Sequence, residues 1–214
     1  MRPVRWFVTT VLTVALFALI VPWSVAAQDT PATPVATPAG TPIALGAAEC
    51  TVDPIEPVSY GNAVRAAVSV TDPPAIETGQ PADAETVTAV SETIRTAIAC
   101  SNAGDMARLL TLTDPAFAPA MLGVDRTDVQ PEIDRAVAES PVERGQAAPP
   151  LIEESTGQEV SATLLGIGDI VSFPNGTAAV RMQLDSPQTG GQANATAWLR
   201  RTDAGWLVTT WALK

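Results

Sequence analysis

The spacing of apolar residues changes near residue 160, and this change limits the fold more than any other feature of the chain. Before that point apolar residues recur every three or four positions, which places them on one face of an α-helix. After it they alternate with polar residues, which is the pattern of a strand with one buried face. Helices followed by consecutive strands predict an α+β domain.

The strongest helical pattern runs from residue 81 to residue 102. Its apolar stripe consists of Val87, Val90, Ile94, Ala97 and Ile98. Pro81 and Asp83 suit the first turn of a helix, and Gly104 suits its end. The sequence therefore predicts one long helix at the start of the domain.

Two aspartates each stand directly before a further helical pattern. Asp105 precedes a short helix predicted around Leu109, and Asp114 precedes another that contains Phe117. An aspartate at such a position accepts hydrogen bonds from free backbone amides, so we interpret both as helix N-caps. A catalytic carboxylate is the alternative for both. A further helix is predicted over 125–139.

Residues 140–158 contain three prolines and are predicted to form a surface loop, after which the alternating pattern begins. Four strands are predicted, over 160–173, 177–184, 193–202 and 206–213. Gly166 and Gly168 permit a bulge in the first strand, and Pro174-Asn175-Gly176 is a tight hairpin turn. The expected architecture is a curved antiparallel sheet of four or more strands wrapped over the long helix.

The first 27 residues have the three parts of a secretory signal peptide. Arg2 and Arg5 give a positive start, an apolar run follows over 6–21, and small residues precede Gln28. Cleavage after Ala27 is predicted. The alternative is a retained anchor, because the run is shorter than the roughly 20 residues that span a bilayer but membrane thinning would accommodate it. The protein is expected to be secreted or extracytoplasmic, with association to the cell envelope as a further option.

Residues 28–48 are predicted to be a disordered Thr/Pro-rich tether. Proline lacks an amide donor and disfavours helix in the residue before it, and Thr-Pro occurs four times here. The stretch has too few apolar groups to offset the entropy lost on ordering. An O-glycosylated stalk is a second interpretation of this composition. Residues 49–80 are predicted to form an irregular arm with a short helix capped by Ser59, and residues 81–214 form the domain.

Cys50 and Cys100 are the two cysteines of the chain, and we predict that they form one disulfide. An even pair in an exported protein most simply pairs, and two buried free thiols are the alternative. A redox-active pair would need close spacing such as Cys-x-x-Cys, which the sequence lacks. The predicted bridge joins the arm to the long helix.

The absence of histidine excludes several classes of chemistry. There is no Ser–His or Cys–His nucleophile pair and no imidazole metal ligand. Lys214 is the only lysine, and 12 basic residues face 23 acidic ones, so nucleic-acid binding is not expected. The formal charge of -11 becomes -13 without residues 1–27, which hold two arginines and no acid. No run has the spacing of a calcium loop, and neither a metal nor another cofactor is expected.

Several segments of the sequence resemble those of a known family. They are Ala99–Asp105, Leu109–Leu110, Thr113–Asp114 and Ala197–Val208. Together with the order of elements they resemble the nuclear transport factor 2-like superfamily, which includes SnoaL-like polyketide cyclases and ketosteroid isomerases. The resemblance covers about residues 81–213. It implies a cone-shaped α+β barrel whose sheet curls around the first helix and leaves an apolar pocket at one end.

Enzymes of that superfamily place an Asp or an Asp/His pair in the pocket, and steroid isomerases add a Tyr. This chain has no histidine, and its single tyrosine, Tyr60, lies outside the predicted domain. Asp169 is the remaining candidate base, because an acid among apolar residues can have a raised pKa. The alternative is a solvent-exposed Asp169, since its neighbours Gly168 and Ile170 would face inward.

Trp198, Trp206 and Trp211 are candidates for lining an apolar pocket, with core packing as the alternative. Trp206 and Trp211 would point to opposite faces of an unbroken strand. The arginines of the predicted sheet are Arg181, Arg200 and Arg201. They could clamp an anionic ligand, and surface ion pairs are the alternative.

The leading hypothesis is an exported bacterial domain that acts as a non-catalytic binding or interaction module, with a small apolar molecule or a protein as its partner. An isomerase, cyclase or hydrolase of the SnoaL-like type, which uses an Asp for proton transfer, is the second hypothesis. The third is a structural envelope protein that forms a homodimer through the outer face of its sheet. Membrane contact is expected only through an uncleaved signal segment.

Overall fold

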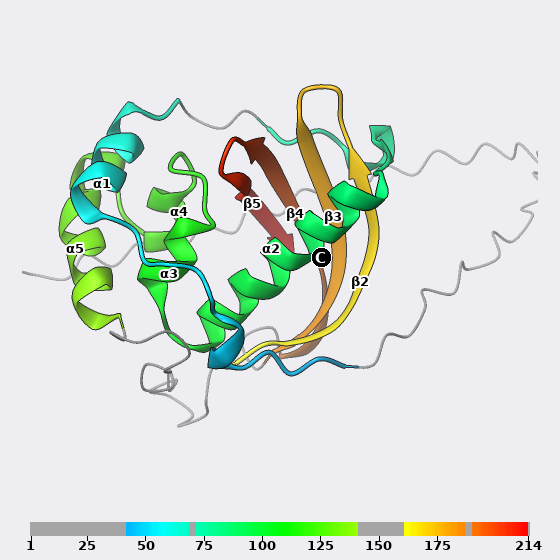
Figure 1. Cartoon of the computed structure of the whole chain (residues 1–214), viewed down its shortest axis with the longest axis horizontal. Helices are drawn as coiled ribbons and strands as arrows, with labels where there is room; N and C mark the ends of the chain where they lie inside the picture. Colours follow the sequence, from blue (N-terminus) through cyan, green and yellow to red (C-terminus); the bar gives the residue numbers. More distant parts are fainter. Residues whose placement is uncertain (1–41, 69–71, 141–160, 187–189, 214) are drawn as a thin grey trace, which may run out of the picture. The chain divides into compact units, whose positions relative to one another are not determined.

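The central element of this computed structural model is a five-stranded antiparallel sheet. The structure describes residues 42–68, 72–140, 161–186 and 190–213. The strands are β1 (Gln80–Pro81), β2 (Thr163–Ser172), β3 (Thr177–Ser186), β4 (Gly191–Thr202) and β5 (Gly205–Leu213). Their order in the sheet follows their order in the chain (Figure 1). The predicted α+β class and the four-stranded meander are confirmed, and β1 is an addition to them.

The sheet is open, whereas the resemblance implies a cone-shaped α+β barrel. Its edges are β1 and β5, and within the described ranges these two strands do not pair. Closure needs a continuous ladder between the first and last strands, and β1 has only two residues. The register of β2 against β3 shifts on both sides of Gly166 and Ile167, in the stretch where the sequence predicts a bulge.

Three predicted segments lie wholly or mostly outside the described residues: the signal peptide over 1–27, the tether over 28–48 and the loop over 140–158. The last part of the predicted tether is described and packs on the sheet. Ile43 forms an antiparallel bridge with Leu164, its amide donating to the Leu164 carbonyl at 2.9 Å, and Leu45 is buried. Packing therefore begins before the boundary that the sequence suggests for the arm.

The long helix predicted over 81–102 is α2 (Ala84–Asn102), which crosses one face of the sheet (Figure 1). Asp83 caps it, because its carboxylate accepts a hydrogen bond from the Thr86 amide at 2.7 Å. Gly104 follows the last turn in the left-handed region, at a φ of 66°. The largest fully buried side chains between helix and sheet are Val90, Ile94, Leu164, Val180, Leu199 and Val208.

Four further helices share a second hydrophobic core. They are α1 (Pro57–Ala66), α3 (Met106–Thr111), α4 (Ala118–Leu122) and α5 (Val129–Glu139). Three short 3-10 turns are η1 (Ala47–Glu49), η2 (Ile76–Thr78) and η3 (Arg126–Asp128). Val64, Leu110, Val129 and Ile133 are fully buried in this second core. The predicted helix over 125–139 is confirmed as α5 and its preceding turn.

The cap of α1 differs from the sequence prediction, which placed Ser59 there. Pro57 occupies the first turn, where a residue without an amide donor is favoured. The helix therefore begins three residues earlier than expected, and Glu56 is its N-cap. The Glu56 carboxylate accepts hydrogen bonds from the amides of Val58 and Ser59, at 3.2 and 2.7 Å. A hydrogen bond from the Ser59 side chain, together with these two amide bonds, lowers the pKa of the Glu56 carboxyl.

A short stretch after α3 joins the two cores. Thr113 forms a parallel bridge with Val208 of β5. The Asp114 amide donates to the Val208 carbonyl and the Val208 amide donates to the Leu112 carbonyl, both at 2.8 Å. These bonds pair part of the outer edge of β5 and fix the helices against the sheet. They also place Asp114 beside β4 and β5.

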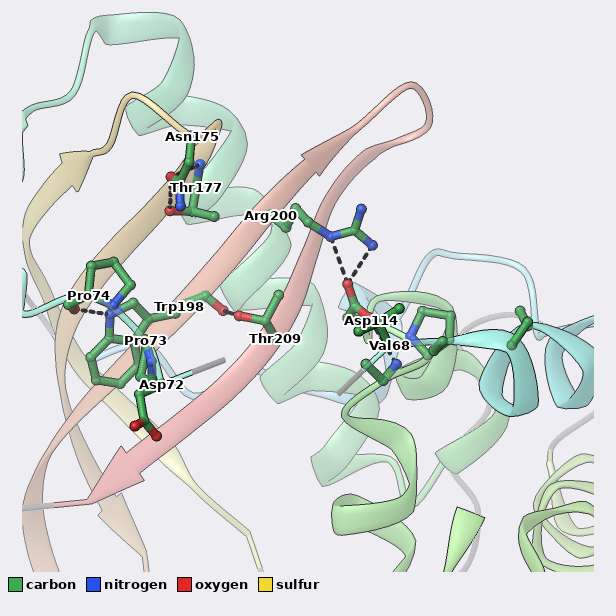
Figure 2. A pocket seen from close by; sticks show the side chains of 15 residues that line it. Val68, Asp72, Pro73, Pro74, Asp114, Asn175, Thr177, Trp198, Arg200 and Thr209 are labelled. Carbon is green, nitrogen blue, oxygen red and sulfur yellow. Dashed lines mark hydrogen bonds and ion pairs between the residues drawn. The ribbon is translucent and has the colours of Figure 1, made fainter. Parts of the chain in front are cut away.

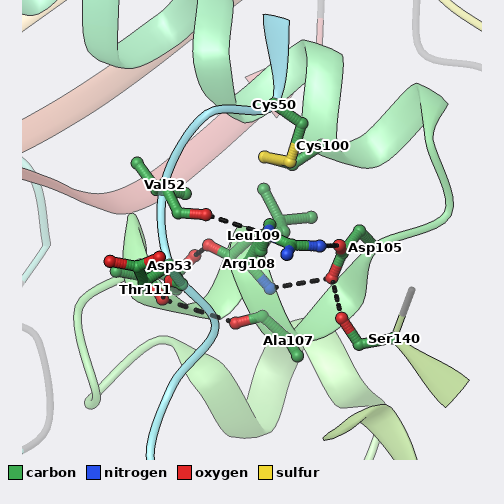
Figure 3. Close-up of a disulfide and its surroundings, with 11 residues drawn as sticks. Cys50, Val52, Asp53, Cys100, Asp105, Ala107, Arg108, Leu109, Thr111 and Ser140 are labelled. Carbon is green, nitrogen blue, oxygen red and sulfur yellow. Dashed lines mark hydrogen bonds and ion pairs between the residues drawn. A yellow bond between two sulfur atoms is a disulfide. The ribbon is translucent and has the colours of Figure 1, made fainter. Parts of the chain in front are cut away.

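The predicted disulfide between Cys50 and Cys100 is confirmed (Figure 3). Both residues are buried, with exposed fractions of 3% and 0%. Cys100 belongs to the last turn of α2, and Cys50 belongs to the segment that leads to α1. The bridge therefore ties the two ends of a long stretch of chain, which are 50 residues apart.

A buried ion pair between Asp105 and Arg108 lies next to the disulfide (Figure 3). Their side chains are 1% and 3% exposed. Asp105 is the predicted N-cap of α3, and its carboxylate accepts the Arg108 amide at 3.1 Å and the Ser140 hydroxyl at 2.7 Å. Arg108 Nε donates to the Val52 carbonyl at 2.9 Å. Partners from three separate segments thus compensate the cost of burying these charges.

The double substitution C50A/C100A should lower the free energy of unfolding without changing the fold. Closing a loop of this length restricts the unfolded chain by about 4 kcal/mol in the chain-entropy model, and we take that figure as the upper bound of the loss. Chemical denaturation followed by tryptophan fluorescence measures it. Reducing agent should lower the stability of the wild type and leave the variant unaffected. Equal sensitivity of both proteins to reductant would contradict the role given to the bridge.

Substitution of Arg108 by methionine should destabilise the protein by about 3–5 kcal/mol, because it leaves the Asp105 carboxylate buried without its cation. The matched variant R108M/D105N removes both charges and keeps an oxygen that can cap α3. It should be more stable than R108M alone when both are unfolded with urea. If the double variant loses as much stability as the single one, the ion pair does not carry the effect.

Candidate functional site

A cleft of about 600 Å³ lies on the face of the sheet opposite α2 (Figure 2). Its walls come from the C-terminal half of α1, from residues 72–74, from residues 114–116 and from β3, β4 and β5. Trp198 and Arg200 line it, and they alternate along β4 with Ala197 and Leu199, which belong to the core under α2. The site therefore lies where the second core meets the outer face of the sheet.

Trp198 forms one wall of the cleft and also fixes a neighbouring segment. Its indole Nε1 donates to the Pro74 carbonyl at 3.0 Å. The ring packs with a small cluster on the outer face that includes Ile76 and Phe173. Trp198 is therefore half-buried, with one part of its side chain in this cluster and another part lining the cleft. Its placement thus combines the two alternatives, core packing and lining of a cleft, and a role in ligand binding stays a prediction.

An ion pair between Asp114 and Arg200 forms the opposite wall (Figure 2). Arg200 Nε and Nη2 donate to the same carboxylate oxygen, Oδ2, at 2.8 and 2.6 Å. The Asp114 side chain is 7% exposed, whereas that of Arg200 is 50% exposed. Asp114 Oδ1 accepts the Ala116 amide at 2.9 Å. Asp114 therefore caps a turn, and α4 starts later than the sequence predicts, after Phe117.

A small polar group closes the third side of the cleft. The Thr177 hydroxyl and amide donate to Asn175 Oδ1 at 2.7 and 3.2 Å, so the side chain of the hairpin turn is fixed. The walls supplied by α1 and by the prolines are made of small or rigid side chains. The cleft thus combines apolar side chains with several oriented polar groups. Such polar groups fix the orientation of a ligand in its site.

Asp169, the candidate base, does not belong to this site. Its side chain is exposed on β2, and it is not among the residues that line either described cleft. Ile170 beside it is buried. The alternation of the strand explains this placement, because consecutive residues face opposite sides.

The three tryptophans lie on two faces of the sheet. A bulge in β5 determines which face Trp211 occupies. The pairing of β5 with β4 shifts at Thr209, whose hydroxyl donates to the Trp198 carbonyl at 3.0 Å. One extra residue reverses the alternation of a strand. Trp206 and Trp211 therefore both pack on the core under α2, which corrects the opposite faces expected for an unbroken strand. Of the three, Trp198 alone lines the larger cleft.

The remaining arginines of the sheet form exposed ion pairs. Arg181 pairs with Glu77 at 2.6 Å, and Arg201 pairs with Glu85 at 3.3 Å. Arg201 and Trp206 line a second cleft of about 290 Å³, between the start of α2 and the turn that joins β4 to β5. Arg200 is thus the arginine that the structure brings to the larger cleft.

Neither a cluster of metal-ligating side chains nor a membrane-spanning helix occurs in the described part of the chain. These ranges contain no group of three or more Cys, Asp or Glu side chains arranged to hold a metal ion. Within them, no helix has the length and apolar character needed to cross a bilayer. The buried disulfide is consistent with an extracellular location.

No protein-family model, curated protein or solved structure matches this chain. Membership of the nuclear transport factor 2-like superfamily therefore stays a prediction, which rests on the residue motifs and the order of elements. The functional proposal depends on the cleft and its side chains.

Tyr60 packs against the second core and contacts the stretch that joins the two cores. Its hydroxyl donates to the Thr113 carbonyl at 3.2 Å. Burial raises the pKa of the Tyr60 phenol above its usual range, and the nearby Asp114 carboxylate raises it further. The unfolded phenol has a pKa of about 10, so the folded state disfavours the phenolate.

Alkaline titration tests this arrangement, because Tyr60 is the only tyrosine in the chain. Phenolate absorbance should appear at about pH 10 in urea-unfolded protein and well above that pH in the folded protein. The sign follows from linkage: only the unfolded state releases the proton near pH 10, so stability is unaffected below that pH and falls above it. Tyr60→Phe should lack this alkaline loss. A folded-state midpoint near 10 would contradict the buried placement of the phenol.

Proposed function

We propose that this protein is an exported, non-catalytic binding module that holds a small, partly apolar molecule in the cleft between α1 and the outer face of the sheet. The observation that supports it is the cleft itself, whose volume of about 600 Å³ falls within the range of small-molecule sites. The larger cleft is lined by a tryptophan, by prolines and alanines, and by the polar residues Asp72, Asp114, Asn175, Thr177, Arg200 and Thr209.

The positions and contacts of the acidic residues Asp169 and Asp114 favour binding over catalysis. The rival enzyme hypothesis requires a carboxyl that faces a cavity and is free to exchange a proton. Asp169 is exposed and lies outside the cleft. Asp114 faces the cleft, but an arginine and a backbone amide occupy its oxygens. Its contacts suit a group that holds Arg200 in position.

Export and family membership are parts of the same proposal. The Cys50–Cys100 disulfide supports an oxidising compartment, and the predicted signal peptide supplies the route. The succession of α2, shorter helices and a four-stranded meander supports a nuclear transport factor 2-like domain over residues 81–213. The ligand site proposed here lies on the outer face of the sheet, whereas the pocket implied by the resemblance lies between sheet and helix.

The binding proposal can be tested with N-phenylnaphthylamine, a neutral apolar probe that becomes fluorescent when it leaves water. The wild-type protein should bind it, and Ala63→Trp should weaken binding by about tenfold or more, because Ala63 lines the cleft and a tryptophan there fills it. Ala63 is exposed on α1, so the substitution should leave the fold intact.

The matched control is Ala138→Trp, at an exposed position of α5 that lines neither described cleft. It should bind the probe as the wild type does. Probe affinity that is the same in the wild type and in A63W would show that the cleft is not the binding site.

A further inference from the structure

We propose that the ligand of the cleft is an amphipathic anion, whose carboxylate or similar acidic group binds Arg200 while its apolar body lies against Trp198 and the wall of α1. This inference rests on the proposed binding function and names the chemical class of the ligand. It begins from the way in which Arg200 uses its donors.

Arg200 binds Asp114 through only one edge of its guanidinium group. A guanidinium has five N–H donors arranged along two edges. Nε and Nη2 donate to Asp114 Oδ2. Within the described residues Nη1 makes no hydrogen bond, and Figure 2 shows this third nitrogen directed away from the carboxylate. The edge formed by Nη1 and Nη2 is therefore available, and its geometry matches the two oxygens of a carboxylate.

Asp114 holds this free edge in place before any ligand arrives. Its side chain is 7% exposed and is itself fixed by the Ala116 amide. An arginine that is already oriented loses less rotamer entropy when it binds a second partner. Asp114 also offsets the charge of Arg200, so the attraction for an anion depends on short, directed hydrogen bonds. A formal charge of -11 for the whole chain gives no long-range attraction for an anion either.

The rest of the cleft suits an apolar body. Ala63, Ala66 and Pro115 present small or rigid side chains with no polar group, and Trp198 presents an aromatic surface. Asp72 is the other acid of the lining. It is exposed and lies beside Trp198, across the cleft from Arg200 in Figure 2. An anion at Arg200 would therefore be separated from it, and water would screen the repulsion.

The test compares two probes that differ by one acidic group: anilinonaphthalenesulfonate, an amphipathic anion, and the neutral N-phenylnaphthylamine. Replacing Arg200 alone would leave Asp114 buried without a cation, so the working variant is R200Q/D114N, in which a neutral pair replaces the ion pair. Arg181→Gln is the matched control, because Arg181 lies on the same face of the sheet, pairs with an exposed glutamate and does not line the cleft.

R200Q/D114N should bind the anionic probe about 10-fold to 100-fold more weakly than the wild type, the range expected for losing charge-assisted hydrogen bonds. Its affinity for the neutral probe should change by less than about twofold, which also shows that the cleft is intact. R181Q should change neither affinity. If R200Q/D114N retains wild-type affinity for the anion while both probes still bind, the anion site is wrong and the cleft proposal stands. If the wild type binds neither probe, both proposals fail.

Discussion

The buried ion pair of Asp105 and Arg108 is the interaction on which the rest of the structure depends. Two charges that are almost fully removed from water are stable only when every partner is in place. Those partners come from the start of α3, from the arm at Val52 and from the end of α5 at Ser140. The ion pair therefore determines how three distant segments meet, and the neighbouring disulfide ties the arm to α2 at the same place.

The cleft is a consequence of two cores that do not merge. One core lies between α2 and the sheet, and the other lies among α1, α3, α4 and α5. The stretch through Thr113 pairs with β5 and joins them, but small side chains on α1 leave space above the outer face of the sheet. Asp114 and Arg200 span this space at one side. An open sheet suits such a site, because its outer face is free to contact the helices.

Much of the fold could be predicted from the sequence, because local patterns determine it. The stripe through Val90 and Ile94 predicts α2, and the alternation through Val180 predicts β3. An even pair of cysteines, in a chain whose start has the pattern of a signal peptide, predicts the disulfide. The cleft could not be predicted, since its walls come from segments as far apart in the chain as Ala63 and Thr209. The bulge at Thr209, where the hydroxyl donates a hydrogen bond to the Trp198 carbonyl, also moves Trp211 to the other face of the sheet. A bulge of one residue is difficult to recognise in the spacing of apolar residues.

By itself the sequence determined the α+β class, the long helix, the meander and the cap at Asp105, because each depends on residues within a few positions of one another. Tertiary structure decided that the sheet stays open, that Arg200 rather than Arg181 or Arg201 reaches the larger cleft, and that Asp114 serves as its partner. The physical reason is the range of the forces involved. Periodicity reports which face of an element is buried, whereas ion pairs and clefts form between elements whose contact the chain order does not specify.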